Sequence, residues 1–79
     1  MRDLLVDLVR RYQDYDPATG RFDYPRPASE YAALLGIHQM TLYSFYRGKF
    51  RRSYAIMKGF TRAFPHVAEE ATALFRKVA

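Results

Sequence analysis

The stretch SEYAALLGIHQMTLYSFYRGK, residues 29–49, decides the fold of this 79-residue chain. Ala32 lies four residues before Gly36, and Leu42 and Phe45 are spaced for the buried side of a following helix. Two helices that cross over a tight turn need a small side chain at the crossing, a glycine that reverses the chain, and inward apolar residues at positions i and i+3. The stretch therefore predicts a helix that ends at Gly36, a turn, and a second helix that carries both apolar residues.

The remaining elements follow from the same kind of pattern. Apolar residues recur at helical spacing along the chain, and prolines and glycines interrupt them. The predicted elements are a helix over residues 2–13, a loop over 14–27, a helix from Pro27 or Ser29 to Gly36, and helices over 39–47, 53–64 and 66–78. The predicted fold class is thus all-α, a single compact domain of about five short helices in which the second and third form a helix-turn-helix.

Particular residues are expected at the helix ends. Either Pro27 lies in the first turn of the second helix or Ser29 is its N-cap, and His38 is placed to start the third helix. Ser53 is the expected N-cap of the fourth helix. The expected buried stripe of that helix is Tyr54, Met57, Phe60 and Phe64. Gly59 weakens the helix unless a neighbouring backbone approaches it closely.

The loop over residues 14–27 is rich in turn-forming residues. Asp16 can cap a turn with its side chain, and Gly20 can adopt a positive φ. Phe22 and Tyr24 alternate with charged residues, which fits a very short strand or two aromatic rings that fill a gap in the core. We favour the second interpretation.

Positive charge is concentrated in the middle of the chain. The formal net charge is +5. Residues 31–68 contain no Asp or Glu, and their basic residues are Arg47, Lys49, Arg51, Arg52, Lys58 and Arg62. A segment without internal neutralisation attracts a polyanion. Nucleic acid is therefore the leading candidate partner, and a merely solubilising surface is the alternative.

Residues 28–64 resemble the lambda-repressor-like helix-turn-helix family, the phage repressor and Cro type. YRGK at residues 46–49 is similar to the end of that family's recognition helix, and SYAIMKGFTRAF at residues 53–64 is similar to the helix that follows. An ordinary αα-hairpin with no nucleic-acid role is the alternative. The chain departs from the family at Ala28, where relatives often have a glutamine that contacts a phosphate, and in its long connection between the first two helices.

The resemblance assigns roles to the third helix and to the connection after it. A recognition helix turns its outward face to the major groove, with its N-terminal residues nearest the base edges. The residues expected to contact bases are Gln39, Met40, Tyr43, Ser44 and Arg47. The residues expected to contact phosphates are Lys49, Arg51, Arg52 and Thr41. Gln39 matches the glutamine that starts the family's helix, and its amide can bridge N6 and N7 of adenine.

The sequence offers little for other kinds of site. It has no cysteine, and neither His38 nor His66 has a metal ligand at suitable spacing beside it. Glu69 and Glu70 are neighbours, which diverge on a helix and so form no catalytic carboxylate pair. We expect no metal, no cofactor and no enzymatic activity. Because neither a transmembrane segment nor a signal peptide is visible, the expected location is the cytoplasm, associated with the nucleoid, for a prokaryotic or phage-encoded protein.

Together these features favour a sequence-specific regulator that binds double-stranded DNA and represses by occupying a promoter. Proteins of this type usually bind inverted repeats as dimers. The candidate dimer face on the last helix consists of Val67, Leu74, Phe75 and Val78, which fit a role in closing the core equally well. One rival function is an antitoxin or phage accessory factor that acts mainly through a protein partner. Another is a single-strand binder that stacks bases on Tyr43, Tyr46, Phe50 and Tyr54.

Overall fold

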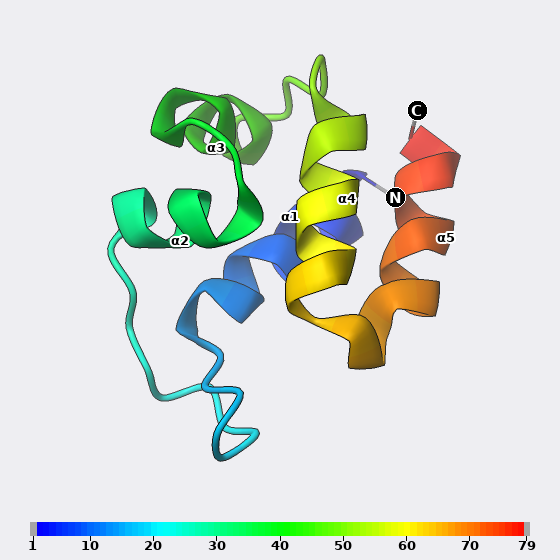
Figure 1. The fold of residues 1–79 in the computed structure, drawn as a ribbon. Helices are drawn as coiled ribbons and strands as arrows, with labels where there is room; N and C mark the ends of the chain where they lie inside the picture. The colour runs from blue at the N-terminus through cyan, green and yellow to red at the C-terminus, as the bar shows by residue number, and fades with distance from the viewer. Residues whose placement is uncertain (1, 79) are drawn as a thin grey trace.

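The computed structural model describes residues 2–78 and the side chains of residues 4–77. Its elements are α1 (Arg2–Arg11), the 3₁₀ turn η1 (Tyr12–Asp14), α2 (Ala28–Leu35), α3 (Gln39–Tyr46), α4 (Ser53–Ala63), the 3₁₀ turn η2 (Pro65–Val67) and α5 (Ala68–Val78). Residues 2–78 contain no β-strand, and a single antiparallel bridge joins Asp16 to Arg21. The predicted all-α bundle of five helices is confirmed (Figure 1).

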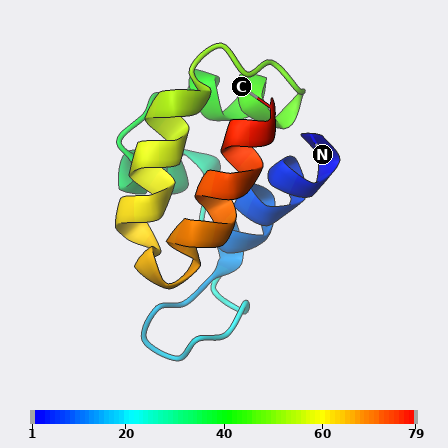
Figure 2. The ribbon, with the colours of Figure 1, turned by 90° about the vertical axis from the view of Figure 1, so that its right-hand side faces the viewer.

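One core joins the five helices. Figure 2 shows α5 between α1 and α4, while α2 packs on both α4 and α3. Phe45 of α3 stacks on Phe75 of α5 with ring centroids 5.9 Å apart, and Phe60 of α4 meets Tyr12 edge-on at 5.5 Å. Each such aromatic pair contributes roughly 0.5–1.5 kcal/mol beyond the burial of its area. The buried residues are Leu5, Val9, Tyr12, Tyr31, Ala32, Leu35, Leu42, Phe45, Ile56, Phe60, Phe64, Ala71 and Phe75.

The turn between α2 and α3 forms as the sequence predicts. Gly36 ends α2 in the left-handed conformation with φ +72°, which residues with a Cβ rarely adopt. The Ile37 N–H then donates to the carbonyl oxygen of Ala32 at 2.9 Å. His38 begins α3, because its Nδ1 accepts a hydrogen bond from the N–H of Met40 at 3.0 Å. Local hydrogen bonds thus fix the chain on both sides of the turn.

Gly59 lies at the contact between α4 and α2. A Cβ atom at this position would lie 2.8 Å from the carbonyl carbon of Leu35 and closer still to its oxygen. Side chains do not tolerate such distances to a neighbouring backbone, so glycine alone permits this approach. The close backbone that the sequence required is present, and it holds α2 directly on α4.

The predicted buried stripe of α4 is wrong at one residue. Tyr54 is 68% exposed, and Ile56 is buried in the core instead. At about 100° per residue, Tyr54 lies about 120° around the helix from Phe60, whereas Ile56 lies only about 40° from it. The core therefore selects Ile56, and the larger tyrosine ring stays in solvent.

Two helix starts also differ from the prediction. Pro27 is itself the N-cap residue of α2, in an extended conformation, so the helix begins one residue after it and neither predicted alternative holds. The carbonyl of Pro27 accepts the first helical hydrogen bond, from the Tyr31 N–H at 3.0 Å. Ser53 is the first residue of α4 rather than its cap. Its N–H already donates to the carbonyl of Phe50 at 3.2 Å, so the chain turns before reaching it.

The loop over residues 14–27 is closed at its base and leaves the bundle at the end away from α3 (Figure 1). The side-chain amide of Gln13 donates to the carbonyl of Arg26 at 2.9 Å, and the guanidinium of Arg26 donates to the carbonyl of Gln13 at 3.2 Å. As predicted, Asp16 caps the turn by accepting from the Ala18 N–H at 2.9 Å, and Gly20 has φ +75°. The long connection is therefore a defined hairpin-like loop.

Phe22 and Tyr24 of this loop differ in their contacts. Phe22 packs edge-on against Tyr12 with ring centroids 5.1 Å apart, and the guanidinium of Arg11 covers its ring at 4.3 Å. Tyr24 stays exposed beneath the guanidinium of Arg26, which is 5.0 Å from the ring centroid. The expectation that both rings fill a gap in the core is thus wrong for Tyr24 and holds only in part for Phe22, which covers the edge of the core.

Candidate nucleic-acid interface

The two faces of α3 separate as the helical pattern predicts. Leu42 and Phe45 are fully buried and anchor the helix on the core. Met40 is 58% exposed on the opposite side. The other residues expected to contact bases are Gln39 and Ser44, which are half-buried, and Tyr43 and Arg47, which are exposed. The outward face of α3 therefore combines amide, hydroxyl, apolar and cationic groups.

The connection between α3 and α4 places cations beside that face. Gly48 turns the chain with φ +88°, and the Lys49 N–H returns to the carbonyl of Ser44 at 2.9 Å. Phe50 then packs against Phe45, with ring centroids 4.9 Å apart. Because Phe50 pins the middle of the connection to the core, the basic side chains on either side of it remain outside. Lys49, Arg51 and Arg52 are all exposed.

The two groups of residues meet in one groove, which we call the α3–α4 groove. It has a volume of about 620 Å³, and its lining residues are Met40, Thr41, Ser44, Gly48, Lys49, Phe50, Arg51, Arg52 and Ile56. Three of the four residues expected to contact phosphates thus lie at one edge, and Thr41 lies half-buried within the groove. The structure brings them together with Met40 and Ser44, two of the residues expected to contact bases. Gln39 and Tyr43 lie elsewhere on α3, and Arg47 directly follows its last residue.

The acidic residues lie on other elements. Asp3 and Asp7 are on α1, Asp14 is in η1, Glu30 is in the first turn of α2, Glu69 and Glu70 are in the first turn of α5, and Asp16 and Asp23 are in the long loop. Neither α3, α4 nor the connection between them carries a carboxylate side chain. A positive potential over the α3–α4 groove is therefore not neutralised locally.

A polar network that the sequence analysis missed supports the back of α3. The hydroxyl of Tyr46 donates to the side-chain oxygen of Gln13 at 2.8 Å, and the guanidinium of Arg10 lies over the Tyr46 ring at 4.7 Å. Burial raises the pKa of Tyr46 above its ordinary value, although the nearby Arg10 opposes this shift. Tyr46 therefore holds α3 to the base of the long loop. A residue 33 positions away in the sequence gives no local signal of this contact.

The four aromatic residues of the single-strand alternative do not form one exposed platform. Tyr46 is tied to Gln13 and Phe50 packs on Phe45. Tyr43 is exposed on α3, whereas Tyr54 is exposed on α4 beside Lys58, whose ammonium lies 5.4 Å from the ring centroid. Stacking of successive bases needs neighbouring free rings, so these four residues do not provide a stacking surface.

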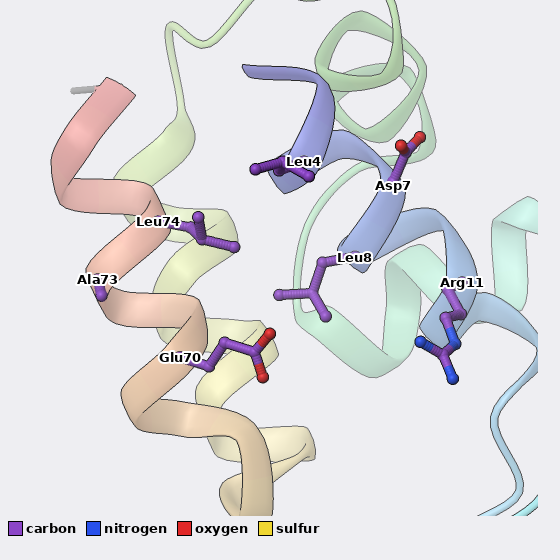
Figure 3. A pocket seen from close by; sticks show the side chains of 7 residues that line it. All are labelled: Leu4, Asp7, Leu8, Arg11, Glu70, Ala73 and Leu74. Atoms are coloured by element: carbon purple, nitrogen blue, oxygen red, sulfur yellow. The ribbon is translucent and has the colours of Figure 1, made fainter. Parts of the chain in front are cut away.

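A second groove, which we call the α1–α5 groove, lies between α1 and α5 (Figure 3). Its lining residues are Leu4, Asp7, Leu8, Arg11, Glu70, Ala73 and Leu74. Leu4 is 57% exposed there and points toward Leu74 across the groove. Figure 1 shows α4 between α2 and α5, and both α1 and α5 also contact α3 through side chains such as Arg10 and Phe75. Leu4 and Leu8 belong to the apolar pattern that predicts the first helix, but that pattern does not distinguish a groove-lining leucine from a core residue.

The candidate dimer face on α5 is only partly exposed. Leu74 lines the α1–α5 groove, and Val67 is half-buried in η2. Phe75 is only 2% exposed because it stacks on Phe45, so it belongs to the core and not to a contact surface. The side chain of Val78 lies outside the described residues.

The described residues also bear on metal sites and on membrane-spanning helices. Among the described residues, no group of three or more His, Asp or Glu side chains is arranged to hold a metal ion. His66 lies in η2, where its Nε2 is 3.3 Å from the hydroxyl of Tyr12. No helix among the described residues has the length and apolar character needed to cross a membrane. Comparison of the chain with protein-family models, curated proteins and solved structures gave no match.

Proposed function

We propose that the protein is a sequence-specific regulator of transcription that binds double-stranded DNA through α3 and acts as a repressor of the phage repressor and Cro type. The observation that carries this proposal is the α3–α4 groove, where the polar outward face of α3 continues into three exposed cations. Phosphate contacts fix the position of a protein on the duplex, and base contacts select the sequence. The groove offers groups suited to both tasks on one surface.

In this proposal α3 enters the major groove, which is about 12 Å wide and accommodates a helix about 10–12 Å in diameter. Gln39 lies at the N-terminal end of α3, nearest the base edges, and Arg47 lies at its other end. Lys49, Arg51 and Arg52 then neutralise phosphates along the adjacent strand. Such a protein excludes polymerase from a promoter by occupancy, and its proposed location is the cytoplasm, at the nucleoid of a prokaryote or in cells infected by its phage.

Selection from a randomised duplex pool at about 0.15 M salt tests the proposal. We expect enrichment of a defined site, and Gln39→Ala should relax the preference at one or two positions by about 1–3 kcal/mol. Arg51→Ala with Arg52→Ala should instead weaken binding to all sequences alike. Arg21→Ala, which removes a cation from the distant loop, is the matched control and should change neither property. Retention without enrichment, or no retention at all, would refute the proposal.

We further propose that the protein binds an inverted repeat as a homodimer, with the α1–α5 groove as the contact between copies. The groove combines apolar side chains with opposite charges: Leu4 is exposed and Leu74 half-buried, while Asp7 and Arg11 lie one helical turn apart on α1. A twofold axis can oppose Asp7 of one copy to Arg11 of the other at two equivalent places. No residue of α3 lines the groove, so the outward face of α3 stays free in this dimer.

Exchanging the charges of Asp7 and Arg11 tests this contact in the absence of DNA. Sedimentation should show a dimer for the wild type and monomers for Asp7→Arg and for Arg11→Asp, because each single change opposes like charges. The double variant should dimerise again, and an equimolar mixture of the two single variants should form heterodimers. Leu4→Glu should give a monomer that keeps the wild-type fold by circular dichroism. A monomeric wild type, or a dimer indifferent to these charges, would exclude this surface as the contact.

A further inference from the structure

Gln39 and Tyr43 are paired on the exposed face of α3. They are four residues apart and therefore lie one above the other on the helix. The side-chain Nε2 of Gln39 donates a hydrogen bond to the phenolic oxygen of Tyr43, with 3.3 Å between the two atoms. We propose that Tyr43 is a positioning residue that holds the Gln39 amide ready to recognise adenine. This inference rests on the proposed function and adds a role for Tyr43 that the resemblance does not supply.

The hydrogen-bonding capacity of the amide supports this role. A glutamine amide has two N–H donors and one carbonyl acceptor. The bond to Tyr43 uses one donor, which leaves one N–H and the carbonyl oxygen. In the major groove adenine presents an acceptor at N7 and a donor at N6. The groups that Tyr43 leaves free are therefore the complement of the adenine edge.

Tyr43 is itself suited to hold another side chain. Its backbone lies between Leu42 and the next buried position at Phe45, so the core fixes the helix beneath it. A tyrosine ring has only two rotatable torsions, whereas a free glutamine side chain loses more freedom when it binds. Holding Gln39 before DNA arrives reduces that ordering cost.

The experiment measures base preference at the position that Gln39 reads. The duplex selected by the wild type is compared with duplexes changed at single base pairs, using the wild type, Tyr43→Phe, Gln39→Ala and the double variant. We expect Tyr43→Phe to reduce the preference for adenine at that one position by about 3- to 10-fold, as for the loss of one hydrogen bond. Binding to non-specific duplex should not change. Tyr54→Phe makes the same chemical change at an exposed tyrosine on α4 and should have no effect.

If the effects of Tyr43→Phe and Gln39→Ala on base preference are not additive, Tyr43 acts by positioning Gln39. In the Gln39→Ala background Tyr43→Phe should cause no further loss at that base pair, because no amide remains to be positioned. Effects that multiply, or a Tyr43→Phe variant with the full adenine preference, would overturn the inference while Gln39→Ala still supported the proposed function. A wild type with no base preference would overturn both. In the free protein, the side-chain amide signals of Gln39 in NMR spectra should shift in Tyr43→Phe, and unchanged signals would also overturn the inference.

Discussion

Replacement of Gly59 by alanine should destabilise the protein, although the same change in an open helix is stabilising. The new Cβ would lie 2.8 Å from the carbonyl carbon of Leu35, whereas ordinary contacts begin at 3.4 Å. The two helices would have to separate by at least about 0.6 Å at this point, and the closer carbonyl oxygen requires more. Because both obstructing atoms belong to the backbone, no side chain can rotate to make room.

The expected change in the free energy of unfolding for Gly59→Ala follows from two opposing effects. Overpacking costs about 1–3 kcal/mol, and a backbone obstacle places Gly59→Ala at the upper end, about 3 kcal/mol. The higher helix propensity of alanine returns about 1 kcal/mol, so the net loss is about 2 kcal/mol. A protein of this size has a stability of roughly 4–12 kcal/mol. At about 4–8 °C for each kcal/mol, the melting temperature should fall by about 8–16 °C.

Thermal and urea denaturation followed by circular dichroism measure this change. Lys58→Ala and Lys58→Gly form the control pair at the neighbouring exposed position of α4, where alanine should be favoured over glycine by about 1 kcal/mol. Alanine in place of glycine should therefore raise the free energy of unfolding at position 58 and lower it at the adjacent position 59. If Gly59→Ala melts at or above the wild-type temperature, the close approach of α2 and α4 described here is incorrect.

Three further predictions concern binding, capping and alkaline pH. Arg51→Ala with Arg52→Ala should reduce the slope of log K against log salt by about 1.8, the contribution of two phosphate contacts, in fluorescence titrations with duplex DNA. His38→Ala should lower the free energy of unfolding by about 1 kcal/mol in urea titrations, because its Nδ1 caps α3. Burial raises the pKa of Tyr31 and of Tyr46 in the folded protein. Both tyrosines therefore stabilise the fold fully below their unfolded pKa of about 10, and this contribution should be lost as the pH rises above about 10, as pH-dependent denaturation would show.

Each of these results has a contrary outcome. An unchanged salt slope would mean that the two arginines do not contact phosphate. His38→Asn should restore most of the stability that His38→Ala removes, and an Asn variant as unstable as the Ala variant would contradict the capping role. Tyr46→Phe should flatten the decline of stability above about pH 10. A variant with the same decline as the wild type would contradict the burial of that hydroxyl.

The parts of the fold that the sequence predicts depend on local backbone chemistry. Gly20 and Gly36 both have positive φ, and His38 and Asp16 both accept hydrogen bonds from N–H groups two residues ahead. Such signals require no knowledge of distant residues, because the chemistry lies within a few positions of the chain. The helical pattern of α3 separates Leu42 from the exposed face for the same reason.

Other features depend on which elements meet in space. Tyr54 and Ile56 are both apolar enough for the core, and only the packing of α4 on its neighbours decides between them. The contact of Tyr46 with Gln13 joins α3 to the end of η1. The α3–α4 groove depends on Phe50, since its packing on Phe45 directs the surrounding cations outward. Local patterns predict the residue types in the candidate site but not the tertiary contacts that assemble it.

Because its base is closed, the long loop is also a suitable place to insert an additional peptide or domain. Gln13 and Arg26 join the two ends of the loop independently of its tip, and each doubling of loop length costs only about 0.6 kcal/mol. The exposed tip over residues 17–20 projects from the end of the bundle away from α3. An affinity peptide or a whole folded domain inserted there would therefore leave the bundle and the outward face of α3 unobstructed.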